Sequence, residues 1–374
     1  MNLYYYNSVA MFYSDNAFLQ RHIRENYPGM RLFEKVFSVF ARNMTFYDRT
    51  GTITLPINVK PVPGLEMPEF RKMTKSYDQL CQERAVELME LAKMSGRKVA
   101  VMYSGGIDST LILTSFMKAC PNDLDRITVL MNSSSIDENR TFYQDYVIRM
   151  FNDIKHSDFF PLIIGDPRYI YVTGEGNDQL FGSMVTRKMI TLYGEPSIHE
   201  PLTRERIEGF FNNTLSNQRY AEQLTELIFR VKDKAPESVK IDTPFLFFWW
   251  LNLTCKFQSV YVRSAAYAQQ HKDKVGFDFN YQMFFDRPEF QLWSMNNTDL
   301  LIEDSWKSYK QHAKDIIFEY NKDEDYRKNK VKYGSLKYVL RQKDSTVAID
   351  ENMKYHYNYP GDEILNPNNT FATL

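Results

Sequence analysis

The stretch that most constrains the fold is residues 98–120, with the sequence KVAVMYSGGIDSTLILTSFMKAC. Residues 99–103 are an apolar run of strand length, and an apolar-periodic segment typical of a helix starts near Ser109. The two glycines between them permit positive φ and the close approach of a ligand. A helix N-terminus after such a turn presents unpaired amide groups and the positive end of a dipole. The stretch therefore predicts a phosphate site in an α/β domain.

Polar side chains surround these glycines. Ser104 and Ser109 add hydroxyl donors, and Asp108 fits beside an anion only if a divalent cation lies between them. The stretch is not a Walker A loop, because no Gly-Lys-Ser/Thr follows the glycines. A lone pair of glycines fits an ordinary strand-to-helix turn, but the three polar residues together favour a ligand. The sequence Ser-Gly-Gly-Ile-Asp-Ser is similar to the pyrophosphate-binding loop of the ATP pyrophosphatase superfamily. Enzymes of this superfamily cleave ATP to AMP and pyrophosphate.

Strand and helix patterns alternate after this loop. Strand-to-helix repeats with short connections predict a parallel sheet with right-handed crossovers, and ligands of such sheets bind beyond the carboxyl ends of the strands. Polar clusters follow each predicted strand, at residues 104–109, 132–139 and 173–178. The predicted strands are 99–103, 127–131 and 169–173, and the predicted helices are 76–94, 109–118 and 138–151.

The third cluster is a second strong signal. The sequence TGEGNDQLFG, residues 173–182, again leaves a strand through glycines and enters a helix. It places Glu175 and Asp178 at the same end of the sheet as Asp108. Magnesium is commonly held by one or two carboxylates together with phosphate oxygens and water. An Asp helix cap is a common alternative for one such residue, but the pair Asp108 and Asp178 predicts a magnesium site.

Together the two motifs resemble the synthetase domain of asparagine synthetase and of β-lactam synthetase. There the second motif reads approximately Ser/Thr-Gly-x-Gly-Ser-Asp-Glu-Leu-Phe-Gly. This chain departs from it at Asn177, where the family has Ser, and at Gln179, where it has Glu. The resemblance implies an adenine nucleotide α-hydrolase-like core that binds ATP and Mg²⁺.

The resemblance also implies roles for individual residues. Glu175 stands where the family places a residue that positions or deprotonates the attacking amine. Asp108 and Asp178 would hold magnesium. The residues assigned to the nucleotide are Ser104, Gly105, Gly106, Asp108, Ser109, Met131 and Gly174.

A lysine of the synthetases, in a loop of the form Arg-x-Lys-x-Gly, neutralises charge on the phosphates. Lys332 is the candidate in the segment KVKYGS, where Lys330 replaces the arginine. Lys343 is the candidate in a competing register, Arg-Gln-Lys. The surrounding sequence DEDYRKNKVK is equally typical of a solvated basic helix end.

Three regions are expected. Residues 1–95 form a small α+β cap, residues 96–200 form the ATP-binding core, and residues 201–374 form a mostly helical part that completes the synthetase domain. Asparagine synthetase begins with a catalytic cysteine after Met1, whereas Asn2 stands here. Residues 1–95 are also too few for a glutaminase domain, so we expect ammonia or an amine to come from the substrate or a separate supplier.

Composition narrows the class of protein further. The chain has 46 Lys and Arg against 47 Asp and Glu, so no global charge draws it to nucleic acid or a membrane. Its three cysteines form no C-x-x-C pair, which argues against a disulfide framework or a zinc site. No apolar run reaches the 18 residues of a membrane span, and the first residues lack the pattern of a signal peptide. The sequence therefore predicts a cytoplasmic protein.

The predicted activity is an ATP-dependent amide-forming ligase. It would adenylate a small-molecule or peptide carboxylate, release pyrophosphate and transfer the acyl group to an amine or ammonia. Three alternatives stay open at this point: an enzyme of the same superfamily that modifies a nucleobase or nucleotide, a peptide-modifying cyclase, and a degenerate nucleotide-binding scaffold. A nucleic-acid partner is not excluded by composition, and a membrane partner is not expected.

Overall fold

The computed structural model divides the chain into two compact units. One unit comprises Pro68–Phe181 and His271–Arg341, and the other comprises Met1–Met67, Gly182–Gln270 and Gln342–Leu374. The residues that the structure describes are 2–6, 47–53, 60–61, 64–156, 166–260, 281–331, 346–350 and 355–357.

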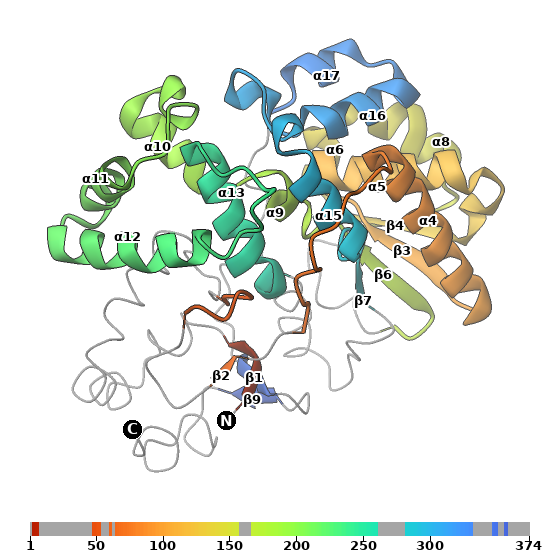
Figure 1. Cartoon of the computed structure of the whole chain (residues 1–374). Helices are drawn as coiled ribbons and strands as arrows, with labels where there is room; N and C mark the ends of the chain where they lie inside the picture. The colour runs from red at the N-terminus through yellow and green to blue at the C-terminus, as the bar shows by residue number, and fades with distance from the viewer. Residues whose placement is uncertain are drawn as a thin grey trace. The chain divides into compact units, whose positions relative to one another are not determined.

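The first unit is built on a five-stranded parallel sheet, which confirms the predicted α/β fold (Figure 1). Its order is β5-β4-β3-β6-β7, which is 3-2-1-4-5 in order along the chain. The order reverses next to β3, which pairs with β4 on one side and with β6 on the other. This is the topological switch point where open parallel sheets bind ligands. The strands are β3 (Lys98–Met102), β4 (Ile127–Met131), β5 (Asp153–His156), β6 (Tyr169–Thr173) and β7 (Tyr281–Met283).

The two edge strands, β5 and β7, were not predicted. The sequence of β5 is DIKH, which has only one apolar residue because an edge strand is half exposed. β7 has three residues and pairs with β6 although more than a hundred residues separate them in the chain. Neither local periodicity nor strand length identifies such a segment.

Three helices of this unit pack together beside the sheet. α4 (Tyr77–Met94) lies against α5 (Ile107–Ala119), and α5 also contacts α16 (Gln311–Asn321) (Figure 1). α4 begins where predicted, because Ser76 and Gln79 form a capping box. α5 buries residues on all its sides, as a helix enclosed by a sheet and two helices must. α15 (Pro288–Asn296) and α17 (Glu324–Asn329) complete the described helices that follow β7.

The structure of the segment after β4 differs from the predicted continuous helix 138–151. A helix begins earlier, at α6 (Ser133–Glu138), because the Asn132 side chain accepts a hydrogen bond from the Ser135 amide. It is interrupted at Asn139, whose side chain caps the next turn by accepting from the Phe142 amide. The remainder is α7 (Arg140–Phe142), a π-helical turn at Tyr143–Val147 and α8 (Ile148–Met150).

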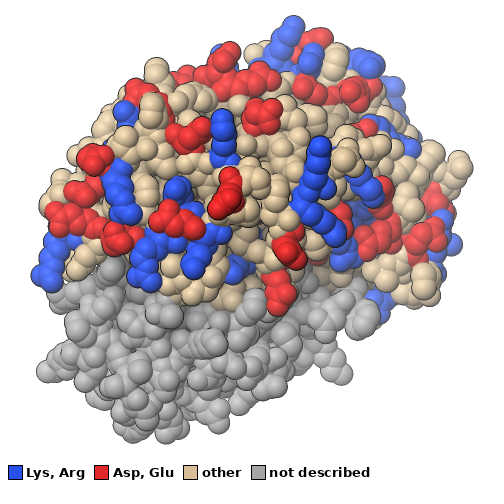
Figure 2. All heavy atoms as spheres, viewed as in Figure 1, with Lys and Arg blue, Asp and Glu red and all other residues tan. Residues whose placement is uncertain are grey.

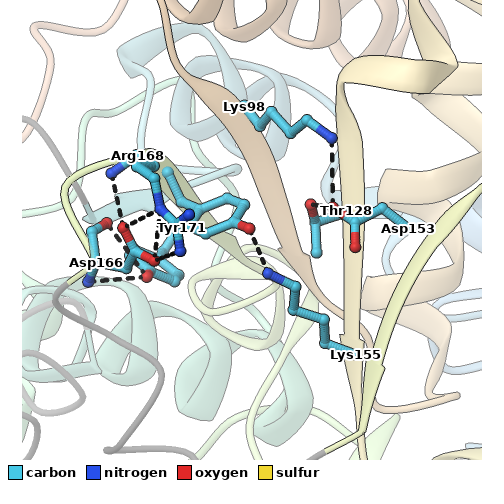
Figure 3. A network of polar contacts seen from close by, with 8 residues as sticks. Lys98, Thr128, Asp153, Lys155, Asp166, Arg168 and Tyr171 are labelled. Atoms are coloured by element: carbon cyan, nitrogen blue, oxygen red, sulfur yellow. Dashed lines mark hydrogen bonds and ion pairs between the residues drawn. The ribbon is translucent and has the colours of Figure 1, made fainter.

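A polar network joins the amino-terminal ends of the strands (Figure 3). Asp153, the first residue of β5, accepts a 2.6 Å hydrogen bond from Thr128 and lies 3.4 Å from the Lys98 ammonium. Asp166 forms a forked ion pair with Arg168, which lowers the pKa of Asp166 to about 2. This network lies at the opposite end of the sheet from the glycine loops, so we assign it to the structure of the sheet.

The second unit contains helices and a four-stranded sheet. Its described helices include α10 (Val185–Tyr193), α11 (Arg204–Leu215), α12 (Gln218–Lys232) and α13 (Pro244–Cys255), and the last three confirm the helical character of the region after residue 201. The sheet has the order β2-β1-β8-β9, and β1 (Asn2–Tyr6) pairs antiparallel with β8 (Thr346–Asp350). β2 is Lys60–Pro61 and β9 is Tyr355–Tyr357.

Candidate nucleotide site

Loops after three neighbouring strands meet at the carboxyl edge of the parallel sheet. A Cβ atom on Gly105 would lie 2.3 Å from the Ser135 carbonyl oxygen, so the loop after β3 touches α6 directly. A Cβ atom on Gly174, after β6, would lie 2.9 Å from the Asp108 Cβ atom. The structure therefore brings the polar clusters 104–109, 132–139 and 173–178 together, as parallel strands of one sheet require.

The two serines of the first loop stabilise its turn. The Ser104 amide donates a 3.1 Å hydrogen bond to Ser109 Oγ, and the Gly106 amide donates to Ser104 Oγ at 3.3 Å. Ser109 Oγ donates in turn to the Gly106 carbonyl. Gly106 is the residue before α5 and has no side chain to cap it, so the first turn of this helix keeps the amide groups and dipole end that suit a phosphate.

Gly105 has a packing role that the sequence does not reveal. Its φ is +74°, and the space where a side chain would begin is filled by Ser135 and Glu138. Gly96 offers a matched control, since its φ is +66° and nothing lies within 4 Å of its Cβ position. Gly96→Ala should cost about 1 kcal/mol of unfolding free energy, the cost of a left-handed backbone. Gly105→Ala should cost about 3 kcal/mol, because α6 must also move.

Urea denaturation of the two variants measures this difference. Equal losses of unfolding free energy in Gly105→Ala and Gly96→Ala would contradict the contact between the first loop and α6.

The two predicted magnesium ligands converge on a single ammonium group. Lys310 Nζ lies 2.5 Å from Asp108 Oδ1 and 2.6 Å from Asp178 Oδ1. The Lys310 side chain is fully buried, whereas the Asp108 and Asp178 side chains keep 16% and 30% of their exposure. Two carboxylates 70 residues apart, in the first turns of α5 and of α9 (Asn177–Phe181), are thus held at one point, and both side chains keep some solvent access.

Lys310 was missed by sequence reasoning. It precedes α16 in a left-handed conformation with φ +60°, which is uncommon for a residue other than glycine. Its surrounding sequence, SWKSYKQHAK, carries no motif and contains three lysines. Only the tertiary structure distinguishes the lysine that meets the carboxylates.

Asn177 explains one departure from the synthetase motif. It is fully buried, and its Nδ2 atom donates a 2.6 Å hydrogen bond to Asp108 Oδ1. Its Oδ1 atom accepts a hydrogen bond from the hydroxyl of Tyr77, the first residue of α4. Burial raises the pKa of Tyr77 well above its usual value, so its hydroxyl stays a donor. Asn177 bridges α4 to the Asp108 carboxylate, a span that a serine side chain is too short to cover.

No family model, curated protein or solved structure matches this chain. The sheet order is consistent with Rossmann-like nucleotide-binding cores. Among the residues that the structure describes, no helix combines the length and apolar character needed to cross a membrane. Cys81, Cys120 and Cys255 are buried, and none of them forms a disulfide.

The other predicted residues of the second motif lie around the same edge. The Glu175 amide donates a 3.4 Å hydrogen bond to Thr173 Oγ1, and the Glu175 side chain is partly exposed. Gly176 has φ +91°, and its Cβ position would meet the Met283 side chain at 2.9 Å. Gln179, the second departure from the motif, is buried in α9 (Asn177–Phe181). Met131, the last residue of β4, is also buried.

The two candidate lysines, Lys332 and Lys343, lie outside the described residues. The chain leading to them is anchored beside the site, because Lys330 Nζ lies 2.6 Å from Glu138 Oε1 and donates to the Glu138 carbonyl at 2.8 Å. Asp137, the neighbour of Glu138, is exposed and pairs with Arg140 instead.

A divalent cation at this site would have two protein carboxylates. No cluster of three or more His, Cys, Asp or Glu side chains suited to a metal occurs among the described residues. Two carboxylates are the usual protein contribution when phosphate oxygens and water complete the coordination of magnesium. Asp108 and Asp178 fit magnesium that arrives with a polyphosphate better than a metal held by protein alone.

Proposed function

We propose that the protein is an ATP-dependent amide-forming ligase similar to asparagine synthetase. One observation carries the proposal: the two glycine motifs end neighbouring strands β3 and β6 at the switch point of the sheet, and their aspartates meet at Lys310. Two sequence motifs that resemble those of the synthetases thus lie together at the edge of the sheet where open parallel sheets bind ligands, and this supports the proposal.

The first step joins a carboxylate to ATP. A carboxylate oxygen attacks the α-phosphorus, an O–P bond forms, the bond from the α-phosphorus to the bridging oxygen breaks, and pyrophosphate leaves. The amide groups at the start of α5 and the buried Lys310 ammonium stabilise the charge on the pyrophosphate. Magnesium, held by Asp108 and Asp178, supplies further neutralisation of the phosphate oxygens when bound.

The second step forms the amide. The amine nitrogen attacks the acyl carbon, the C–N bond forms, and the bond from that carbon to the AMP oxygen breaks. Glu175 accepts the proton that the amine loses, since it lies at the same sheet edge and is open to solvent. Binding both reactants at this edge would supply the positioning on which such transfers depend.

The charge pattern on the face in view gives no support to nucleic acid as the acceptor. On the face shown in Figure 2, Lys and Arg side chains are interspersed with Asp and Glu, and no broad basic area lies over the described residues in view. Nucleic-acid binding rests on clustered basic side chains that contact phosphates. A peptide-modifying cyclase would use the same site, and the identity of the acceptor distinguishes it from a small-molecule ligase.

ATP–pyrophosphate exchange tests the proposal. The protein is incubated with ATP, labelled pyrophosphate and pooled carboxylates, with and without Mg²⁺, and label in ATP is counted. The proposal predicts Mg²⁺-dependent exchange with at least one pool of carboxylates. No amine is added, because exchange reports only the first step. Failure of every carboxylate to support exchange would overturn it.

Alanine variants of the two candidate lysines, Lys332 and Lys343, should differ in their exchange rates. If Lys332 neutralises the departing pyrophosphate, Lys332→Ala should lower exchange at least a hundredfold while ATP binding persists, since one charge-stabilising group is commonly worth that factor. Lys343→Ala should then keep exchange within a fewfold of wild type. Exchange rates and ATP affinity measured for both variants decide the register, and the reverse pattern would assign the role to Lys343.

A further inference from the structure

The ammonium of Lys310 occupies the position that a metal ion bound to both Asp108 Oδ1 and Asp178 Oδ1 would take. It lies 2.5 and 2.6 Å from one oxygen of each aspartate, and these are the oxygens through which the pair could share a cation. Magnesium binds carboxylate oxygens at about 2.1 Å, so an ion on both oxygens would overlap the ammonium. The ammonium and a metal ion therefore cannot both occupy the position that contacts Asp108 Oδ1 and Asp178 Oδ1.

The arrangement is built into the fold. The Lys310 side chain has no solvent exposure, and its backbone is in a left-handed conformation immediately before α16. Strained backbone of this kind persists where the surrounding structure fixes it, and it is concentrated at functional sites. A buried ammonium is costly unless it is paired, and here two carboxylates pair with it.

Asp108 is held in place independently of the lysine. The Asn177 side chain donates to the same Asp108 oxygen that meets the ammonium, and Asn177 is itself fixed by the Tyr77 hydroxyl. The carboxylate therefore keeps its orientation if the ammonium leaves. A cation that replaced the ammonium would therefore bind an Asp108 carboxylate that is already oriented.

We propose that Lys310 is an internal counter-cation that excludes divalent metal from the Asp108–Asp178 pair until a polyphosphate arrives. The inference deepens the proposed function and rests on it for the identity of the polyphosphate as ATP. A triphosphate brings oxygens that attract the ammonium and further ligands for the metal, so ammonium and metal exchange places only when nucleotide is present. Metal binding and nucleotide binding are then positively coupled.

Metal binding without nucleotide tests the inference. Free Mn²⁺ is measured by electron paramagnetic resonance while it is titrated into wild type, Lys310→Met and Lys314→Met, each with and without ATP. Methionine keeps the length of the lysine and removes its charge. Lys314 is the matched control, since it is equally buried and lies one helical turn further along α16, where its ammonium donates to the Lys307 carbonyl.

Wild type and Lys314→Met should bind Mn²⁺ at least tenfold more tightly with ATP than without it, after the Mn²⁺ held by ATP in a protein-free titration has been subtracted. Lys310→Met should bind Mn²⁺ alone at least tenfold more tightly than wild type does, and Asp108→Asn in that background should remove the gain. Mn²⁺ should also raise the melting temperature of Lys310→Met and leave that of nucleotide-free wild type unchanged, because the variant lacks the ammonium that competes with the metal.

Tight Mn²⁺ binding by nucleotide-free wild type, or no gain in Lys310→Met, would overturn the inference. Lys310→Gln replaces the methionine variant if the latter does not fold. The experiments separate failure of this inference from failure of the proposed function. If wild type catalyses ATP–pyrophosphate exchange but Lys310→Met does not bind Mn²⁺ more tightly, only the counter-cation role of Lys310 is overturned. If Lys310→Met binds Mn²⁺ more tightly but wild type catalyses no ATP–pyrophosphate exchange, the counter-cation role is supported and the ligase proposal is overturned.

Discussion

Replacing Asp108 with Asn is expected to lower ATP–pyrophosphate exchange about a thousandfold, equivalent to about 4 kcal/mol of transition-state stabilisation. Asn keeps the shape of the side chain but removes the charge that would hold magnesium against the phosphates. The Asp108 carboxylate also meets Lys310 and Asn177 through one oxygen, so its charge organises the site even before ligands bind. Exchange rates at saturating ATP measure the loss.

Asp137→Asn is the matched control. Asp137 lies on α6, which follows another strand at the same sheet edge, but its side chain is 72% exposed and pairs with Arg140. We expect its exchange rate to stay within about twofold of wild type, as for an exposed side chain that is not part of the Asp108–Asp178–Lys310 cluster. Equal effects of the two substitutions, or exchange by Asp108→Asn at the wild-type rate, would contradict the assignment of Asp108 to the site.

Arg84→Met is expected to lower the free energy of unfolding by about 3–5 kcal/mol, the usual cost of removing one partner of a buried ion pair. Arg84 is buried on α4, lies 3.1 Å from Asp286 and donates to the Met283 carbonyl at the end of β7. Burial raises the pKa of Asp286, whose charge the guanidinium stabilises. Removing Arg84 takes the guanidinium away from the Asp286 carboxylate and removes the hydrogen bond from α4 to the end of β7.

Arg71→Met serves as the control for Arg84→Met. The Arg71 side chain is 70% exposed and lies 3.9 Å from Glu289, so its loss should change the unfolding free energy by less than about 0.5 kcal/mol. Urea denaturation of both variants gives the comparison. A loss below about 1 kcal/mol for Arg84→Met, well short of the usual cost, would show that α4 and β7 are held together by other contacts.

Local chemistry made the centre of the sheet predictable. β3 and β6 are buried apolar runs that end in glycines, and each is followed by a helix, so their type and approximate bounds follow from the sequence alone. The start of α4 follows likewise from the Ser76 cap. The adjacency of the two glycine motifs followed from the rule that parallel strands present their carboxyl ends at one edge.

Contacts between distant residues account for what the sequence did not predict. Lys310 reaches Asp108 from 202 positions away, and no feature of its neighbours distinguishes it from other lysines. Gly105 was predicted to admit a ligand, whereas its contact with Ser135 is visible only once α6 is placed. Asn177 looked like a departure from a motif, and its bridge from Tyr77 to Asp108 gives that departure a structural reason.

The products of ATP turnover distinguish an adenylating ligase from an enzyme that cleaves ATP to ADP. Wild-type protein is incubated with Mg²⁺, ATP, a carboxylate that supports exchange, and hydroxylamine as a general amine acceptor, and the nucleotides are separated by anion-exchange chromatography. We expect AMP and pyrophosphate, with one hydroxamate formed for each AMP. Formation of ADP and inorganic phosphate without AMP would contradict the ligase proposal.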